Sequence, residues 1–322
     1  MKPITLLVLS KPTARHLALL DKLPHSTRIV VGDNPEMFAE AAPEAQVLMN
    51  GMMPKTLFHD VFVQCKNLQW VHSLSAGLEN SLFPELVASP LPMTNSRGVF
   101  ARSLAEWVIT GCLYFDKFLA RLAAQKAAHE FKAFEVEELH GKTMGIVGYG
   151  RIGQLTAERA KAFGMKVIAL RKRPELSHGD HNIDATYTPD QLERLMGESD
   201  FVVCAAPLTP DTEGLISAKV IAAMKPTGVF VNVGRGAVVD EEALTVALQQ
   251  KKIRGAALDV FVTEPLPQES PLWDLDNVLI SPHSADHTAT WLNDAMELFV
   301  ENFDRFVHGH PLKNVVDKAA GY

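Results

Sequence analysis

Residues 144–170 constrain the fold of this chain more than any other segment. The apolar run Met144-Gly-Ile-Val147 leads into the glycine loop Gly148-Tyr-Gly-Arg-Ile-Gly153, and an amphipathic helical pattern then ends at Gly164. A second apolar run follows at residues 166–170. This order predicts a strand, a glycine turn, a helix and a second, parallel strand.

Each glycine of this loop has a physical role in such a unit. Gly148 permits a tight turn, Gly150 lets a pyrophosphate approach the backbone, and Gly153 lets helix and strand pack closely. The helix N-terminus supplies N–H donors and the positive end of a dipole. The segment therefore predicts a dinucleotide site, the alternative being a glycine-rich turn that binds no ligand.

Arg171 lies 18 positions after Gly153, at the end of the second strand of this unit. A fold that binds NAD usually places an acidic residue there, which accepts hydrogen bonds from the ribose 2′-hydroxyl. This chain has Arg171-Lys-Arg173 instead, and such a cluster attracts a 2′-phosphate. The pattern predicts NADP as the preferred cofactor. A solvated turn in a protein that uses NAD is the alternative.

The whole chain indicates an ordinary globular protein. Its 322 residues favour two domains, and its net charge of -7 argues against a general nucleic-acid binder. The apolar run at residues 4–9 is too short to cross a membrane, and no signal cleavage site is evident, so we expect a cytoplasmic protein. The three cysteines have no metal-ligand spacing, and His178 and His181 lack a convincing third ligand, so no metal site is predicted.

Short apolar runs alternate with helix-length segments, which predicts an α/β fold with parallel strands. We expect one long helix from about residue 99, and a last helix at residues 291–307 that packs back on the N-terminal part. The expected domains are residues 1–97 with 288–322, and residues 98–287. Strands are expected at residues 4–9, 28–31, 47–49, 68–71, 144–147, 166–170, 201–205, 229–232, 256–258 and 278–280.

Arg235, Glu264 and His283 follow the ends of successive strands behind the glycine loop. Ligands of open α/β sheets bind beyond the carboxyl ends of the strands, so we expect all three near one site. A guanidinium can clamp the carboxylate of an oxo acid, and an imidazole can protonate its carbonyl oxygen as hydride reaches the carbon. A carboxylate would orient that imidazole and favour its protonated form. Each residue alone is more often structural, but together they predict a catalytic site.

The chain resembles the D-isomer-specific 2-hydroxyacid dehydrogenase family, and within it the glyoxylate/hydroxypyruvate reductases, in the glycine loop and in the segments that contain Arg235, Glu264 and His283. The resemblance implies two Rossmann-like domains with doubly wound parallel sheets, the cofactor domain being inserted into the substrate domain, and a homodimer. It is weaker in the first ninety residues and rests mainly on residues 139–153, 207–216, 232–240, 258–265 and 281–283.

The resemblance also implies roles by motif position. Arg235 would bind the substrate, His283 would be the acid/base and Glu264 its partner. The backbone amides of Ser75, Ala76, Gly77 and Leu78 would hold the substrate carboxylate, and Asp259 would lie near the nicotinamide carboxamide. The residues implied at the cofactor are Gly148, Gly150, Arg151, Ile152, Gly153, Arg171, Arg173, Pro207, Thr209, Val233 and Asp259.

The chain departs from the family pattern at Arg171, where relatives carry an acid, and at Arg97, where many have proline. Arg97 either adds positive charge beside the site or is simply exposed. Glu264 argues against the formate dehydrogenase branch, which resembles the family but has glutamine there. The apolar helical stripe of Phe115, Phe118, Leu119 and Leu122 is either a dimer interface or intramolecular core.

The sequence thus predicts an oxidoreductase that reduces a small 2-oxo acid, of the glyoxylate or hydroxypyruvate class, to the D-2-hydroxy acid with NADPH. One alternative is an NAD-dependent D-2-hydroxyacid dehydrogenase that acts oxidatively. Another is a dinucleotide-sensing binding protein without turnover. Neither a nucleic-acid nor a membrane partner is expected.

Overall fold

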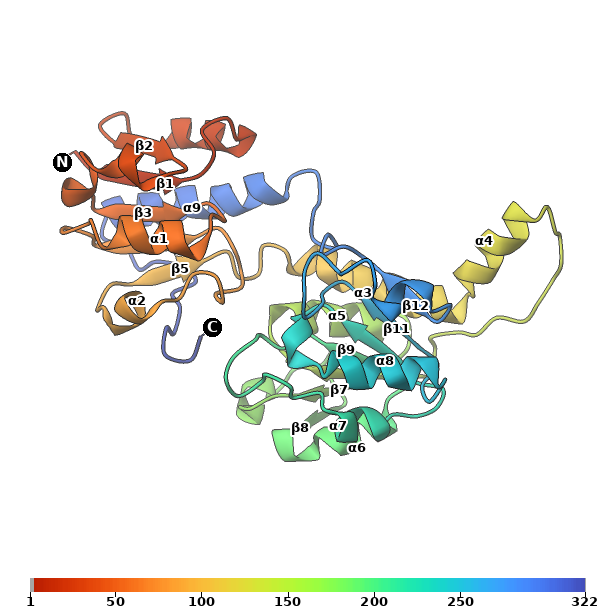
Figure 1. The fold of residues 1–322 in the computed structure, drawn as a ribbon. Helices are drawn as coiled ribbons and strands as arrows, with labels where there is room; N and C mark the ends of the chain where they lie inside the picture. The colour runs from red at the N-terminus through yellow and green to blue at the C-terminus, as the bar shows by residue number, and fades with distance from the viewer. Residues whose placement is uncertain (1–2, 322) are drawn as a thin grey trace. The chain divides into compact units, whose positions relative to one another are not determined.

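The computed structural model describes residues 3–321, and its internal contacts divide the chain into two units. Unit 1 comprises Met1–Phe100 and Thr288–Tyr322, and unit 2 comprises Ala101–His287. Each unit contains one parallel sheet with helices on it (Figure 1). The predicted α/β class with two such sheets is confirmed.

The sheet of unit 1 has five parallel strands in the order β2-β1-β3-β4-β5. Every residue of β1, β3 and β4 is buried, as expected for a parallel sheet that is covered on both faces. Strand β5 was not predicted, because it lies in the proline-rich segment that we expected to be a crossing between domains. The strands are β1 (Thr5–Leu9), β2 (Arg28–Gly32), β3 (Val47–Asn50), β4 (Trp70–Ser73) and β5 (Met93–Asn95).

The last helix, α9 (Trp291–Val307), packs on the N-terminal sheet as expected. Trp70 of β4 stacks on Phe299 with ring centroids 5.4 Å apart, and its indole N–H donates to Thr94 Oγ1 at 2.9 Å. Both rings are fully buried, so this contact anchors the helix. The other helices of unit 1 are η1 (Arg15–Lys22), η2 (Pro35–Phe38), η3 (Ala42–Glu44), α1 (Lys55–Phe62) and α2 (Pro84–Ala88).

The sheet of unit 2 has seven parallel strands in the order β12-β11-β10-β9-β6-β7-β8. The strand order reverses at β6, which pairs with β7 on one side and β9 on the other. In doubly wound sheets, ligands bind at the carboxyl ends of the strands at such a reversal. The strands are β6 (Thr143–Val147), β7 (Lys166–Leu170), β8 (Ala185–Tyr187), β9 (Phe201–Cys204), β10 (Val229–Asn232), β11 (Gly255–Leu258) and β12 (Val278–Ile280).

Helix α3 (Ala101–Asp116) begins two residues later than expected and ends at a buried aspartate. Phe118, in the left-handed conformation, separates it from α4 (Leu119–Ala127), which has no buried residue and projects from the body of unit 2 (Figure 1). The other helices of unit 2 are α5 (Arg151–Ala162), η4 (Pro174–Ser177), η5 (Pro189–Gln191), α6 (Leu192–Glu198), α7 (Ala218–Ala222), η6 (Gly236–Val238), α8 (Glu241–Gln249) and η7 (Pro271–Asp274).

Candidate active site

The glycine loop connects β6 to the N-terminus of α5, as its sequence predicted. A Cβ on Gly148, which has a φ of +93°, would lie 2.6 Å from the backbone nitrogen of Ala206, and one on Gly153 would lie 2.8 Å from the carbonyl oxygen of Gly148. Packing alone therefore requires these two glycines. A Cβ on Gly150, by contrast, would meet nothing within 4 Å. The open space above Gly150, which caps α5, fits a pyrophosphate approaching the helix N-terminus.

Arg235 lies directly beyond the carboxyl end of β10, in a turn that Asn232 shapes. The Asn232 side chain accepts a hydrogen bond from the Gly234 N–H at 3.1 Å and donates to the Arg235 carbonyl at 3.2 Å. A Cβ on Gly236 would lie 1.9 Å from the carbonyl carbon of Phe261, so this turn passes tightly against the segment after β11. Asn232 was not predicted as a site residue, because its role depends on a side chain folding back on its own turn.

Glu264 and His283 form the closest acid–imidazole pair of the predicted site. Glu264 Oε2 lies 2.7 Å from His283 Nδ1, and its other oxygen accepts the Phe261 N–H at 2.9 Å. A carboxylate can only accept, so Nδ1 carries the proton. Among residues 3–321, Nε2 of His283 has no hydrogen-bond partner, and the side chain is 39% exposed. The arrangement leaves one ring nitrogen accessible for proton transfer.

The backbone of His283 is itself unusual, with a φ of +50° in the left-handed region. Asp259 stabilises it: the Asp259 carbonyl accepts the His283 N–H at 2.9 Å, and Asp259 Oδ1 accepts the N–H groups of Ser284 and Ala285 at 3.0 and 3.1 Å. Ser103 of α3 donates to the Ala285 carbonyl at 2.6 Å. Asp259, only 1% exposed, therefore holds the loop that presents the imidazole.

Arg171 follows β7 and donates from Nη1 to Ser177 Oγ at 3.0 Å. Lys172 pairs with Asp211 at 2.8 Å, and both of these side chains are about three-quarters exposed. Asp211 belongs to the loop that also contains Pro207 and Thr209. In that loop, Thr212 Oγ1 donates to the Pro207 carbonyl at 2.6 Å and accepts the Thr209 N–H at 2.8 Å. Arg173 is exposed, whereas Val233 is buried.

Comparison with known proteins now decides the family. The family model "D-isomer specific 2-hydroxyacid dehydrogenase, NAD binding domain" matches residues 110–285. The chain belongs to the D-isomer-specific 2-hydroxyacid dehydrogenase family. It is 33% identical to a glyoxylate reductase from Thermococcus gammatolerans over 294 residues, which cover 88% of this chain and 86% of that protein. Family and relatives make it an oxidoreductase that uses a nicotinamide dinucleotide and acts on 2-oxo or 2-hydroxy acids.

Solved structures of this dehydrogenase family agree with the observed fold. A family member from Aeromonas salmonicida superposes with a TM-score of 0.83 at 31% identity, covering 98% of this chain and 99% of that one. A probable 2-hydroxyacid dehydrogenase from Rhizobium etli, in complex with NADP, HEPES and L(+)-tartaric acid, gives a TM-score of 0.84 at 26% identity with full coverage of both chains.

The predicted substrate loop of the dehydrogenase follows β4 in unit 1. The Ser75 N–H donates to Ser73 Oγ at 3.3 Å, the Ser75 carbonyl accepts the Ser96 N–H at 3.2 Å, and Asn95 Nδ2 donates to the Ala76 carbonyl at 2.7 Å. In the described part of the chain, the N–H groups of Ala76, Gly77 and Leu78 donate no hydrogen bond. The Leu78 side chain is buried. The loop is thus fixed by two carbonyls and by the Ser75 N–H, and it leaves three of the four predicted amide donors unused.

One further acidic residue lies beside His283 and was not predicted. Burial raises the pKa of Asp286, against the opposing effect of His287 and His283. Its Oδ1 is buried without a hydrogen bond in the structure as described, 3.7 Å from His287 Nε2. No sequence pattern points to Asp286, because one aspartate in a loop is ordinarily solvated.

The described residues were considered as metal ligands and as membrane spans. Across residues 3–321, no group of three or more histidine, cysteine, aspartate or glutamate side chains could hold an ion. In the same part of the chain, no helix is both long and apolar enough to span a membrane.

Proposed function

We propose that this protein reduces a small 2-oxo acid, of the glyoxylate or hydroxypyruvate class, to the D-2-hydroxy acid with NADPH. The observation that carries the proposal is the His283–Glu264 pair, whose open Nε2 lies beyond the strand ends of the unit with the glycine loop. Relatives support the substrate class: a glyoxylate/hydroxypyruvate reductase B from Pectobacterium carotovorum is 34% identical over 264 residues, which cover 80% of this chain and 82% of that protein.

The proposed roles follow from the geometry. The bound dinucleotide supplies the hydride that reaches the carbonyl carbon. His283 Nε2 gives its proton to the carbonyl oxygen, while Glu264 holds Nδ1–H and stabilises the imidazolium before transfer. The Arg235 guanidinium clamps the substrate carboxylate, and Asp259 fixes the loop that presents His283.

Two residue sets keep their predicted roles within this proposal. The unused N–H groups of Ala76 and Gly77 suit a carboxylate, because an anion is bound well by backbone donors that have no other partner. Unit 2 is proposed as the cofactor domain and unit 1 as the substrate domain. The glycine loop, Arg171, Thr209 and Val233 lie in unit 2, and the substrate loop lies in unit 1.

The preference for NADPH rests on Arg171, which stands where an acid would select NAD. A structural neighbour, the NADPH-dependent glyoxylate/hydroxypyruvate reductase from Sinorhizobium meliloti in complex with NADP and sulfate, has a TM-score of 0.82 at 27% identity. It covers all of both chains. NAD remains the alternative cofactor.

A steady-state comparison tests the whole proposal. Initial rates are measured with NADPH and NADH against glyoxylate, hydroxypyruvate and the bulkier phenylpyruvate, and the chirality of the product is determined. We expect the highest kcat/KM with NADPH and a small acid, and a D product. Equal or better kcat/KM with NADH would overturn the cofactor preference, and a preference for phenylpyruvate would overturn the substrate class. No turnover with any acid would favour the dinucleotide-sensing alternative.

We also propose a homodimer formed through α4 and the segment after it. The predicted apolar stripe divides in the structure: Phe115 is buried, whereas Leu119 and Leu122 are exposed. Phe131 is fully exposed on the segment that follows. A cavity of about 250 Å³, lined by Phe115, Phe118 and other residues at the base of α4, offers apolar surface to a second copy.

Light scattering on the purified chain tests the dimer. We expect a dimer for the unmodified protein and a monomer for the double variant Leu122→Glu/Phe131→Ser. A monomeric unmodified protein would overturn this proposal. The cytoplasmic location stays a prediction, for which cell fractionation is the test.

A further inference from the structure

Arg171 is part of a four-residue polar cluster that joins three segments of unit 2. Its Nη1 donates to Ser177 Oγ at 3.0 Å, and its guanidinium carbon lies 5.8 Å from the centre of the Tyr149 ring. The Tyr149 hydroxyl, from the glycine loop, donates to Asp180 Oδ2 at 2.8 Å. The cluster therefore links the loop that would hold the pyrophosphate to the end of β7 and the segment after it.

A second cluster in the same unit has the same groups but a different outcome. Arg194 lies 4.9 Å from the Tyr187 ring, and the Tyr187 hydroxyl donates to Glu198 at 2.7 Å. There the same carboxylate also accepts from Arg194 Nε at 2.8 Å, so the guanidinium is neutralised. Arg171, in contrast, forms no ion pair with any residue between 3 and 321, and among those residues only Ser177 accepts a hydrogen bond from its side chain.

Both oxygens of the Asp180 carboxylate have partners other than Arg171. Its Oδ2 accepts from the Tyr149 hydroxyl, and its Oδ1 accepts the Asn182 N–H at 2.9 Å. Burial, together with the hydrogen bond to Asp180, raises the pKa of Tyr149 far above its usual value, so the hydroxyl remains a donor at every physiological pH. Tyr149 thus gives the Asp180 carboxylate a hydrogen-bond partner other than Arg171.

The remaining donors of Arg171 suit a phosphate. A guanidinium carries five N–H donors in a planar fork, and it binds phosphate oxygens in bidentate fashion. Arg171 is partly buried, and its serine partner is only 7% exposed, so the fork is held in one place. The neighbouring cations differ, because Lys172 is paired with Asp211 and Arg173 is exposed.

We propose that Tyr149, Ser177 and Asp180 are positioning residues that hold the Arg171 guanidinium uncompensated for the 2′-phosphate of NADP. Ser177 accepts a hydrogen bond from one arm of the guanidinium, and the Tyr149 ring packs against the guanidinium. The Tyr149 hydroxyl donates a hydrogen bond to Asp180. This inference rests on the proposed NADPH preference and names the residues that create it.

Calorimetric titration of the full chain with two nucleotides tests the inference without turnover. Adenosine 2′,5′-bisphosphate and adenosine 5′-monophosphate differ only in the 2′-phosphate, so the ratio of their affinities isolates its contribution. For Arg171→Ala we expect the affinity for the bisphosphate to fall about tenfold or more, with the monophosphate unchanged. Ser177→Ala is expected to give a smaller loss of the same kind, roughly three- to tenfold.

Tyr149→Phe is the decisive variant, because it keeps the ring and removes only the hydroxyl. Asp180 is then released to pair with Arg171, and we expect the bisphosphate to bind roughly tenfold more weakly. The double variant Tyr149→Phe/Asp180→Asn is expected to restore most of that affinity, since the freed side chain no longer carries charge. The matched controls Tyr187→Phe and Arg194→Ala should leave both affinities unchanged.

The outcomes separate this inference from the function it rests on. If Arg171→Ala leaves the ratio of affinities unchanged, the NADPH preference fails together with the inference. If Arg171→Ala lowers the ratio but Tyr149→Phe and Ser177→Ala do not, only the positioning role is wrong. An equal loss of both nucleotides in Tyr149→Phe, or no rescue by the second substitution, would show that the hydroxyl merely supports the glycine loop.

Discussion

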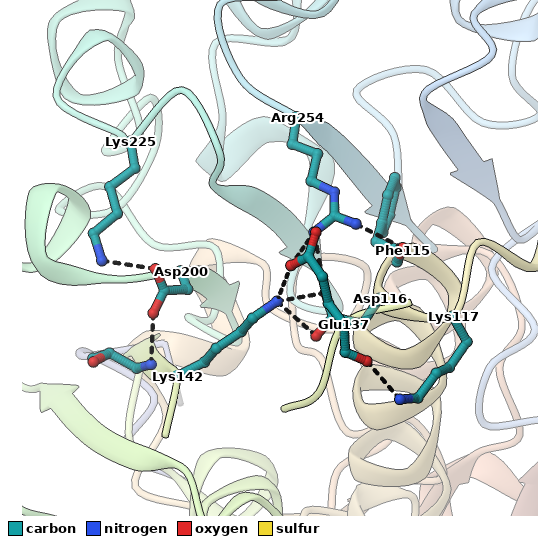
Figure 2. Close-up of polar contacts among 9 residues, drawn as sticks. Phe115, Asp116, Lys117, Glu137, Lys142, Asp200, Lys225 and Arg254 are labelled. Carbon is teal, nitrogen blue, oxygen red and sulfur yellow. Dashed lines mark hydrogen bonds and ion pairs between the residues drawn. The ribbon is translucent and has the colours of Figure 1, made fainter. Parts of the chain in front are cut away.

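Two charged clusters in unit 2 differ in the burial of their central carboxylate and in whether a hydrogen-bonding atom stays open. The first lies at the end of α3 and consists of Asp116, Glu137, Lys142 and Arg254, which we name the α3-end cluster (Figure 2). Lys142 Nζ lies 2.8 Å from both oxygens of Asp116, whose side chain is fully buried. The second is the His283–Glu264 pair, in which both side chains are more than one-third exposed.

The charged groups of the α3-end cluster all pair with one another. Arg254 donates to Asp116 at 3.1 Å and to the Phe115 carbonyl at 2.8 Å, and the Glu137 N–H donates to the Asp116 carbonyl at 2.9 Å. The bonds to Asp116 and Glu137 join the two ends of the segment that contains α4. The His283–Glu264 pair instead leaves one ring nitrogen open. A saturated cluster stabilises the fold and an unsaturated one can exchange a proton, so substitutions should separate stability from turnover.

The largest effect is expected at the open pair. His283→Ala should lower kcat by about 10²- to 10⁴-fold, because no other group then protonates the carbonyl oxygen. The side chain is 39% exposed, so the melting temperature and nucleotide affinity should stay near those of the unmodified protein. Stopped-flow kinetics measures kcat, and calorimetric titration measures the nucleotide affinity. If nucleotide binding disappears together with turnover, His283 has a structural role, and the two clusters do not divide stability from turnover.

Asp116→Ala should have the opposite signature. Removing Asp116 leaves Lys142 and Arg254, both mostly buried, with only the half-exposed Glu137 as a counter-charge, which costs about 3–5 kcal/mol of the free energy of unfolding. Urea denaturation measures this loss, and kcat per folded molecule should be unchanged. A fall in kcat as large as that of His283→Ala would show that the cluster acts on the chemistry. Asp60→Ala, which removes an exposed carboxylate of unit 1, is the control for a general charge effect.

Glu264→Gln sharpens the comparison within the open pair. Glutamine keeps an oxygen for the Phe261 N–H but removes the charge that His283 Nδ1–H meets. Hydrogen bonds to charged groups contribute about 1.5–3 kcal/mol, so kcat/KM should fall roughly 10- to 100-fold. Stability should change by less than about 1 kcal/mol, since the pair is substantially exposed. Unchanged kcat/KM would remove Glu264 from the proposed mechanism.

Elements that depend on local sequence were predicted, whereas features that depend on contacts between distant residues were not. Strands β7, β10 and β12 were predicted to the residue, because each is an apolar run between turn residues. Strands β5 and β8 were missed, since three residues are too few to establish a period. Strand β8 is also an edge strand with two half-exposed residues.

At the site, strand ends predicted that Arg235, Glu264 and His283 lie near one site. All three lie in unit 2, and their common site and their roles stay predictions. The left-handed backbone of His283 was not predictable, because it depends on hydrogen bonds to Asp259 across 25 residues of chain. The three successive cations likewise look alike in sequence. They differ only through partners elsewhere: Asp211 pairs with Lys172, while Ser177 bonds to Arg171.

The smallest effect is expected at the exposed edge of the α3-end cluster. The hydrogen bond from Lys142 lowers the pKa of Glu137 below its ordinary 4.5, so the folded state favours the ionised carboxylate. Its contribution is therefore complete above about pH 4.5 and is lost as the pH falls through the folded-state pKa.

Because the Glu137 side chain is 46% exposed, Glu137→Gln should cost only about 0.5 kcal/mol at pH 7. Thermal unfolding of both proteins across the acid range measures this. The difference in melting temperature should shrink as the pH falls and vanish once Glu137 is protonated in the folded state. A difference that persists there would mean that Glu137 acts through packing, and that the α3-end cluster closes around Asp116 alone.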